Sequence, residues 1–332
     1  MHATLSRRQN LGILLIVGLA AGPALGYEPV PDRLVVLTFD DSVKSHSTVA
    51  APILKRYGFG ATFFVTEGFS FRTNKKDYMT WEEIGELHRQ GFEIGNHTRD
   101  HMGVTSAKVG ELEGQLRAID QRCFDHGIPK PTSFAWPGNA LAPEALVVLR
   151  HHGIRFARRG GAPEYPYEEG RGCAYEPGLD HPLLVPSAGD ARPSWTLEDF
   201  ARAVQQAADG RIAVLQFHGV PEGEHPWVHT PRERFEEYMR YLHDNGYRVV
   251  ALRDLGRWVD ADALPEEPWK FIETRTCGVD RRRWSRTGSH AWRSDGGRVP
   301  PVCGPAGSNE ASARDGVPAL SGREVESAEV GG

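Results

Sequence analysis

The chain has 332 residues, of which 39% are hydrophobic and 25% are charged, and its formal net charge is −5. This composition is typical of a soluble globular protein that can bury a sizeable core. The mild negative balance argues against nucleic-acid binding, which needs a basic face. No apolar run reaches the roughly 20 residues that span a bilayer, so we expect no stable membrane span in the mature protein.

Residues 1–26 have the layout of an export signal peptide. Arg7 and Arg8 precede the apolar run LGILLIVGLAAG, and small residues at 24–26 offer a cleavage site before Tyr27. A basic segment, an apolar segment and small residues are the three parts of a secretory signal. The arginine pair also resembles a twin-arginine signal. We therefore expect a secreted or periplasmic protein, and the alternative is a retained membrane anchor.

In residues 27–262, short apolar runs alternate with amphipathic helical stretches. This pattern predicts a single α/β domain, which we expect to be the catalytic domain. The clearest helix begins at Thr80, which forms a capping box with Glu83, and stops at Gly91. Strands that alternate with helices pair in parallel, in an open sheet or a barrel. In both architectures ligands bind at the carboxyl ends of the strands. The seven strand candidates are 33–39, 61–68, 92–98, 132–137, 154–159, 211–219 and 247–252.

Residues 263–332 are predicted to be a linker and a disordered tail. From residue 274 onward the chain is rich in Gly, Ser and Arg and contains no Lys, Ile or Phe. Such a segment buries too little apolar surface to offset the entropy of ordering it.

The four cysteines are compatible with an oxidising compartment and allow three pairings. None lies in a CxxC pair, so a thiolate zinc site is not expected. Cys123 and Cys173 are interpreted as ordinary core or loop residues.

Polar side chains gather where the predicted strands end. The first strand runs into Asp40 and Asp41, the third is followed by His97 and His101, and the sixth ends at His218. Parallel strands bring these ends to one face, within reach of one divalent cation. A helical turn would place the two histidines, four residues apart, on the same side. Three N or O ligands with open positions are typical of a catalytic metal site.

The adjacent carboxylates need an explanation of their own. Two anions beside an apolar run repel each other and lose hydration, which costs free energy unless a cation or a catalytic task compensates. Neighbours in an extended segment point to opposite faces, so one carboxylate can bind metal while the other faces the reacting water. The alternatives are a solvated turn at Asp40 and Asp41, and a histidine pair that arose by chance on a helix surface.

The motifs resemble those of a known family. TFDDS followed by HTRDH is similar to the first two motifs of the NodB-type polysaccharide deacetylases, carbohydrate esterase family four. SFAWP stands where the third motif falls, and LQFHG resembles the fifth. The resemblance covers roughly residues 33–255. It implies a distorted (β/α)7 barrel, the NodB homology domain, and metal-dependent removal of acetyl groups from N-acetylated or O-acetylated sugars.

The resemblance also implies a role for each strand-end residue. The ligands of a divalent metal ion would be Asp41, His97 and His101, with Zn²⁺ as the expected ion. Asp40 would be the general base and His218 the general acid. The oxyanion would be held by the metal and by the backbone N–H of Gly138. Thr98 would brace the loop that carries the histidines.

Several positions depart from the family pattern. Ser42 replaces a glycine, which a turn with negative φ would tolerate. Ala135 stands where many members carry an arginine that pairs with the base, and Gly138 stands where an aromatic residue lines the sugar groove. Gln216 replaces a leucine that helps line the acetyl pocket, so the acyl group is left open. For the fourth motif the candidate is Asp180.

Arg158 is the candidate for the missing arginine. The strand after the vacant position ends in Arg158 and Arg159. Alternation lets only one of them face the centre, and Arg158 shares the parity of the apolar Phe156. We therefore predict that Arg158 pairs with Asp40, and the alternative is that both arginines are solvated at the rim.

Two further questions stay open at this level. The loop that holds His225, Trp227 and His229 is either a lid with an aromatic platform for a sugar ring or a loop that packs its own tryptophan. The expected function is a secreted metal-dependent deacetylase acting on an acetylated carbohydrate. The alternatives are a hydrolase of this fold that acts on a non-sugar C–N bond, and a non-catalytic glycan-binding module.

Overall fold

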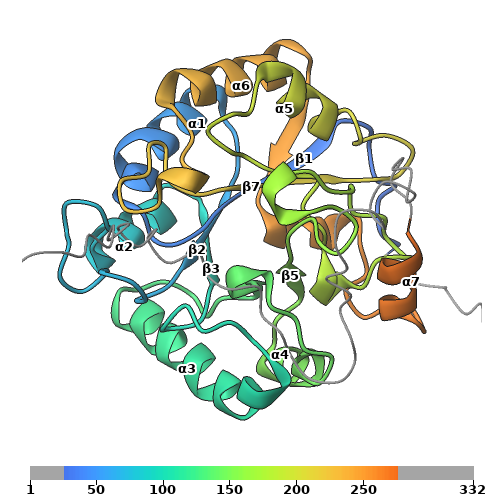
Figure 1. Cartoon of the computed structure of the whole chain (residues 1–332), viewed down its shortest axis with the longest axis horizontal. Helices are drawn as coiled ribbons and strands as arrows, with labels where there is room; N and C mark the ends of the chain where they lie inside the picture. The colour runs from blue at the N-terminus through green and yellow to red at the C-terminus, as the bar shows by residue number, and fades with distance from the viewer. Residues whose placement is uncertain (1–25, 276–332) are drawn as a thin grey trace, which may run out of the picture. The chain divides into compact units, whose positions relative to one another are not determined.

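The computed structural model describes residues 26–275. In this range the strands form a central parallel sheet that curls into a distorted barrel, with the helices around its outside (Figure 1). All seven predicted strands are present, which confirms the predicted (β/α)7 barrel. A further short strand at residues 189–190 was not predicted. The strands are β1 (Leu34–Phe39), β2 (Thr62–Val65), β3 (Glu93–Asn96), β4 (Ser133–Ala135), β5 (Phe156–Arg158), β6 (Gly189–Asp190), β7 (Ala213–Phe217) and β8 (Arg248–Val250).

The strand order is β5-β4-β3-β2-β1-β7-β6, and every pair is parallel. β8 pairs with the beginning of β1, whereas β2 pairs with its end. The segment 185–190 closes the gap between β5 and β7. Val185 bridges to Arg158, the Ala188 N–H donates to the Val214 carbonyl over 2.7 Å, and β6 pairs with β7.

Alternation along β1 separates the inside of the barrel from its outside. Leu34 and Val36 belong to the cluster that fills the interior, while Val35 and Leu37 pack in the cluster beneath the outer helices. Side chains of equal parity share a face. Asp40, the residue that follows β1, therefore lies on the interior side at the carboxyl end of the barrel.

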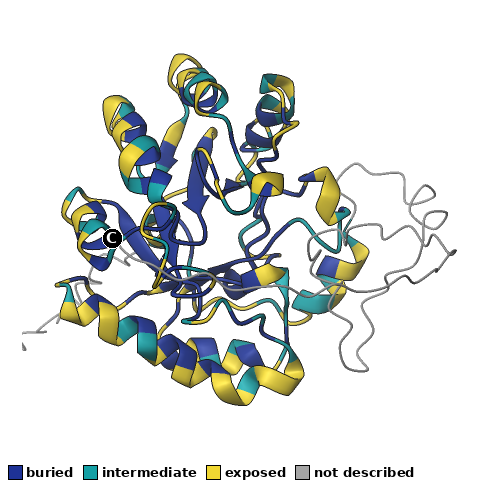
Figure 2. Cartoon of the chain, turned by 60° about the vertical axis from the view of Figure 1, so that its left-hand side comes forward, coloured by how far each residue is buried: buried dark blue, intermediate teal, exposed yellow. Residues whose placement is uncertain are grey.

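The helices cover the barrel with one buried stripe each, and their outer faces are exposed (Figure 2). The capping box of Thr80 and Glu83 is confirmed at the start of α2. The packing of Ile84 and Leu87 against the sheet then gives α2 its stability. The α-helices are α1 (Ala51–Tyr57), α2 (Trp81–Arg89), α3 (Val109–Asp125), α4 (Ala145–His152), α5 (Leu197–Val204), α6 (Arg232–Asp244) and α7 (Pro268–Thr274). None of them is long and apolar enough to span a membrane.

Helical structure extends beyond the predicted boundary at residue 262. Helix α7 packs Ile272, which is 4% exposed, into the cluster beneath α3 and α4. The prediction of a linker here was wrong for residues 268–274, because a single short helix can bury one apolar side chain without a visible period. The predicted tail beyond residue 275 and the signal segment up to residue 25 lie outside the described residues.

Candidate metal and catalytic site

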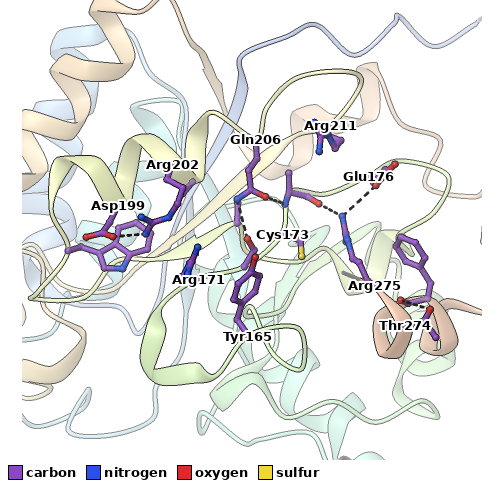
Figure 3. A pocket seen from close by; sticks show the side chains of 16 residues that line it. Tyr165, Arg171, Cys173, Glu176, Asp199, Arg202, Gln206, Arg211, Thr274 and Arg275 are labelled. Atoms are coloured by element: carbon purple, nitrogen blue, oxygen red, sulfur yellow. Dashed lines mark hydrogen bonds and ion pairs between the residues drawn. The ribbon is translucent and has the colours of Figure 1, made fainter. Parts of the chain in front are cut away.

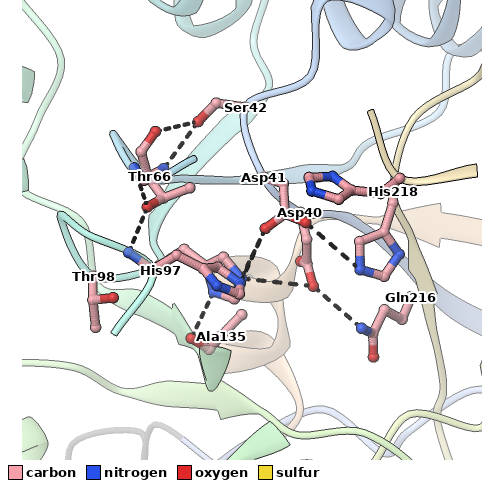
Figure 4. A network of polar contacts seen from close by, with 12 residues as sticks. Asp40, Asp41, Ser42, Thr66, His97, Thr98, Ala135, Gln216 and His218 are labelled. Carbon is pink, nitrogen blue, oxygen red and sulfur yellow. Dashed lines mark hydrogen bonds and ion pairs between the residues drawn. The ribbon is translucent and has the colours of Figure 1, made fainter. Parts of the chain in front are cut away.

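Three residues from two strand ends come together as a group that could hold a metal ion. One oxygen of Asp41 and one nitrogen each of His97 and His101 lie within 4.8 Å of one another. Asp41 lies next to His97 (Figure 4), with its Oδ1 3.4 Å from His97 Nε2. The same oxygen is 3.3 Å from His101 Nε2. The structure thus brings together the three residues predicted as ligands.

The backbone and a carbonyl aim His97 at this point. Its N–H continues the sheet ladder to the Val65 carbonyl, and its Nδ1 lies 2.9 Å from the Ala135 carbonyl oxygen. A carbonyl can only accept, so Nδ1 carries the proton and Nε2 presents its lone pair to the site. An outer partner of this kind orients metal-binding histidines in general.

The turn between the histidines is irregular, so the predicted helical turn is wrong. Thr98 and His101 both have left-handed backbone, with φ of 56° and 52°. The Thr98 hydroxyl accepts the Met102 N–H at 2.7 Å, and the Thr66 hydroxyl accepts the His101 N–H at 3.0 Å. These bonds stabilise a tight turn that helical spacing alone does not describe, and they give Thr98 the predicted bracing position.

The charge and burial of the group fit a divalent cation. Asp41 Oδ1 is buried and has no hydrogen-bond partner among the described residues. Burial would raise the pKa of Asp41, but the surrounding histidines outweigh it and hold this pKa well below its usual range. Burial lowers the pKa of His101 to about 4, so its imidazole is neutral and free to coordinate at neutral pH. One carboxylate and two imidazoles are a ligand set that suits zinc and related divalent ions.

Asp40 lies beside the group and is held by two donors. The Arg158 guanidinium donates from Nη2 to both oxygens of Asp40, and Gln216 Nε2 donates to Oδ2 at 3.3 Å. Asp40 Oδ2 is also 4.0 Å from His97 Nε2. Gln216 therefore contacts the carboxylate expected to act as base.

The two neighbouring arginines have different partners, as alternation requires. Arg158 is fully buried beneath Asp40, and its guanidinium lies 5.5 Å from the ring of Phe64. Arg159 is also fully buried, but it points to the other side and pairs with Glu164 and nearby carbonyls. The alternative of two solvated arginines at the rim is thereby ruled out.

His218 stands on the opposite side of Asp41. Its Nε2 is 3.9 Å from Asp41 Oδ2, and its Nδ1 is 3.8 Å from Asp190 Oδ1. Two residues that follow the first motif support this segment. His46 Nε2 contacts the His218 carbonyl at 3.1 Å, and Ser45 Oγ accepts the Val220 N–H at 2.7 Å.

Sequence reasoning missed Asp190 and chose Asp180 for the fourth motif. Asp180 instead receives two bonds from Arg275, at 2.8 and 2.7 Å, and caps the Glu176 N–H. Burial raises the pKa of Asp190. Its carboxylate accepts a hydrogen bond from Arg192 Nη2 at 2.6 Å, and its other oxygen lies 3.8 Å from His218 Nδ1. β6 has only two residues, which is too short to show the alternation of a strand in the sequence. The acidic residue at the end of this strand is the signal that could have identified Asp190.

Ser42 does not keep the negative φ that we expected. Its φ is 57°, and that of Asp41 is 75°, both in the left-handed region. The Ser42 hydroxyl donates to the Thr66 carbonyl and accepts the Thr66 N–H, both at 2.9 Å. These two bonds offset the strain of a left-handed residue with a side chain. Strained backbone at this position turns the chain so that the two carboxylates diverge.

Gly138 follows β4 in a short 3-10 turn and has a φ of 58°. It lies directly after the strand whose Ala135 carbonyl orients His97. Its predicted role as an oxyanion donor stays a prediction.

A separate cavity of about 610 Å³ lies between α5, α7 and the segment around Cys173 (Figure 3). Its lining does not include Asp40, Asp41 or the site histidines. Among its polar side chains, Arg202 pairs with Asp199 and Arg275 pairs with Glu176. Cys173 is disulfide-bonded, which corrects its interpretation as an ordinary residue, while Cys123 is free and buried.

The fold and the site together define an α/β barrel with a three-ligand metal-type centre flanked by a carboxylate and a histidine. The family model described as polysaccharide deacetylase matches residues 27–157 of this chain. Arg158, Asp190 and His218 lie beyond the matched range, so the tertiary structure supplies their relation to the site.

Two curated relatives resemble the same part of the chain. A peptidoglycan-N-acetylglucosamine deacetylase from Bacillus cereus is 27% identical over 129 residues, which are 38% of this chain and 56% of that protein. A chitooligosaccharide deacetylase from Azorhizobium caulinodans is 31% identical over 124 residues, or 36% and 55% of the two chains. The chain thus spans about half the length of these relatives.

Among solved structures, a family 4 acetyl xylan esterase from Clostridium thermocellum, in complex with a cobalt ion, is 22% identical. It superimposes with a TM-score of 0.47 over 69% of this chain and 94% of that chain.

Proposed function

We propose that this protein is a metal-dependent carbohydrate deacetylase that hydrolyses acetyl groups from an acetylated glycan. One observation carries the proposal: Asp41, His97 and His101 converge on one point, with Asp40 on one side and His218 on the other. The family match and the named activities of the two relatives support the same chemistry.

Each residue has a task that its surroundings suit. Asp41, His97 and His101 would hold the divalent ion, for which zinc is our expectation. When bound, such an ion polarises a carbonyl group and lowers the pKa of water. Asp40, fixed by Arg158, would take the proton from the attacking water. His218 would protonate the departing amine or alcohol, since an unprotonated amine is a poor leaving group.

Residues 1–26 favour export, and we infer a secreted or periplasmic protein that meets its glycan outside the cytoplasm. The acetyl group that is hydrolysed is either an N-acetyl or an O-acetyl group.

The test is acetate release from a panel of N-acetylated and O-acetylated glycans, with a simple non-sugar acetamide as a further arm. We expect release from at least one glycan, loss of release after chelation, and recovery on adding Zn²⁺. Release from the acetamide alone would favour the non-sugar hydrolase, and glycan binding without any release would favour the non-catalytic module.

A further inference from the structure

A row of rings leads from the metal-type centre to the surface. The centroid of Phe69 lies 4.4 Å from that of His101 and 4.6 Å from that of His225, and His225 is 5.2 Å from Trp227. Phe69 is 47% exposed and Trp227 is 52% exposed. We call Phe69, His225 and Trp227 the ring row.

The residues of the ring row lie in two loops, which follow the two strands on either side of β1. Phe69 lies in the loop after β2 and Trp227 in the loop after β7, and both strands pair with β1, which delivers Asp40 and Asp41. The loop after β2 packs closely on the site: a Cβ on Gly68 would lie 2.7 Å from the Cβ of His101. Only glycine permits this approach, which sets Phe69 against the metal-ligand candidate.

Hydrogen bonds between the loops hold the row in place. Glu224 accepts from the Tyr78 hydroxyl at 2.8 Å and from the Asn74 amide at 2.7 Å. The Thr230 N–H donates to the Gly219 carbonyl at 3.0 Å and closes the second loop at its base. The exposed rings are therefore pre-organised, which reduces the entropy lost when a ligand binds.

Polar atoms without partners lie in and beside the row. His225 Nδ1 and Glu222 Oε2 are buried and have no hydrogen-bond partner among the described residues. The Glu222 side chain is 1% exposed and lies 3.7 Å from His225. Exposed rings next to unsatisfied donors and acceptors suit a ligand that has an apolar face and hydroxyl groups at its edge.

We propose that the ring row binds a pyranose ring of the glycan adjacent to the acetylated sugar. The inference rests on the proposed function. The axial C–H bonds of a pyranose face carry slight positive charge and pack on the negative face of an aromatic ring. The row begins at His101, so a sugar bound on it is a direct neighbour of the sugar at the reacting centre. The substrate class is then an oligomer or polymer, and an isolated acetylated monosaccharide leaves most of the row unused.

The test compares an acetylated monosaccharide with a tetrasaccharide of the same sugar. Trp227→Ala and Phe69→Ala should each raise KM for the tetrasaccharide roughly three- to ten-fold, and each should raise KM for the monosaccharide by a smaller factor. Trp227→Phe should restore most of the affinity. The matched control is Phe124→Ala, an aromatic residue that is 78% exposed on α3, which should change nothing. Metal content is measured in every variant, because Phe69 touches His101.

A second arm separates this inference from the proposed function. Calorimetry with a fully deacetylated tetrasaccharide measures binding to the wild-type protein and to Trp227→Ala without any reaction. If the wild-type protein and Trp227→Ala release acetate from the acetylated tetrasaccharide with equal kinetics, the inference about the ring row is wrong. The proposed deacetylase activity is then still supported. If the deacetylated tetrasaccharide binds to the wild-type protein but not to Trp227→Ala, and no glycan releases acetate, the ring row is confirmed as a sugar-binding site. The proposed deacetylase activity is then wrong. A change of oligomeric state in Trp227→Ala, with unchanged KM, would assign the row to self-association and also overturn the inference.

Discussion

Arg158 donates to both carboxylate oxygens of Asp40 from β5, the strand next to the one on which the family resemblance led us to expect this arginine. β4 and β5 pair in register, so that Arg158 lies directly beside Ala135. A long guanidinium side chain on β5 can thus replace one on β4, because the two positions are neighbours in the sheet. The pair is fully buried, and a buried pair of this kind is costly to break although its net contribution to stability is small.

The first prediction concerns metal binding. The purified protein should contain about one equivalent of divalent ion, and His101→Ala should lose most of it, because two remaining ligands bind weakly. Metal analysis by mass spectrometry measures the content. His225→Ala is the control, since His225 lies near the centre but outside the ligand group. Full retention in His101→Ala would refute the ligand assignment.

The second prediction separates the two aspartates. Asp40→Asn and His218→Ala should each lower kcat by about two orders of magnitude or more, as expected when a general base or acid is removed. Both variants should keep the metal, because neither residue belongs to the ligand group. Loss of metal in Asp40→Asn, together with retention in Asp41→Asn, would show that their roles are reversed.

The third prediction concerns Arg158. Arg158→Ala should lower kcat/KM sharply, because the Asp40 carboxylate then loses the guanidinium that donates to both of its oxygens and orients it. Arg158→Lys keeps the charge and should restore part of the activity. Thermal unfolding is measured alongside, since an unpaired buried charge costs about 3–5 kcal/mol of stability. An unchanged kcat/KM in a folded Arg158→Ala protein contradicts the prediction.

Arg159 is an unsuitable control for that experiment. It is fully buried and pairs with Glu164, so Arg159→Ala should destabilise the fold rather than leave it unchanged.

The fourth prediction concerns pH and stability through Glu93. This carboxyl is buried and accepts from Thr62 and Ser133, and burial raises its pKa. A carboxyl with a raised folded-state pKa stabilises the protein below its unfolded pKa, and this contribution is lost as the pH rises through the folded value. Glu93→Gln should therefore unfold at a higher temperature than the wild type at neutral pH, with the difference shrinking toward pH 4. A pH-independent difference would show that charge is not the cause.

The fifth prediction concerns α7. Truncation after residue 262 should lower the melting temperature by several degrees, because it removes Ile272 from the core and Arg275 from Asp180. Ile272→Ala should reproduce part of the loss, while Leu264→Ala, at an exposed position, should not. An unchanged melting temperature in the truncated protein would mean that α7 adds no stability.

The sequence alone determined the barrel and most of its centre. Apolar runs that end in Asp40, His97 and His218 predicted strands, and parallel pairing predicted that their ends meet. Parity along a strand then selected Arg158 over Arg159. These inferences succeeded because period, strand direction and strand end are local properties, which a regular sheet converts directly into positions in space.

The tertiary structure decided what depends on short or irregular segments. Asp190 faces His218 from a strand of two residues, and Ser42 takes a left-handed φ that two bonds to Thr66 make tolerable. The contact of Phe69 with His225 joins loops far apart in the chain. Such segments carry no period, so their geometry follows from the packing and hydrogen bonds of distant residues, and those become visible only once the chain has folded.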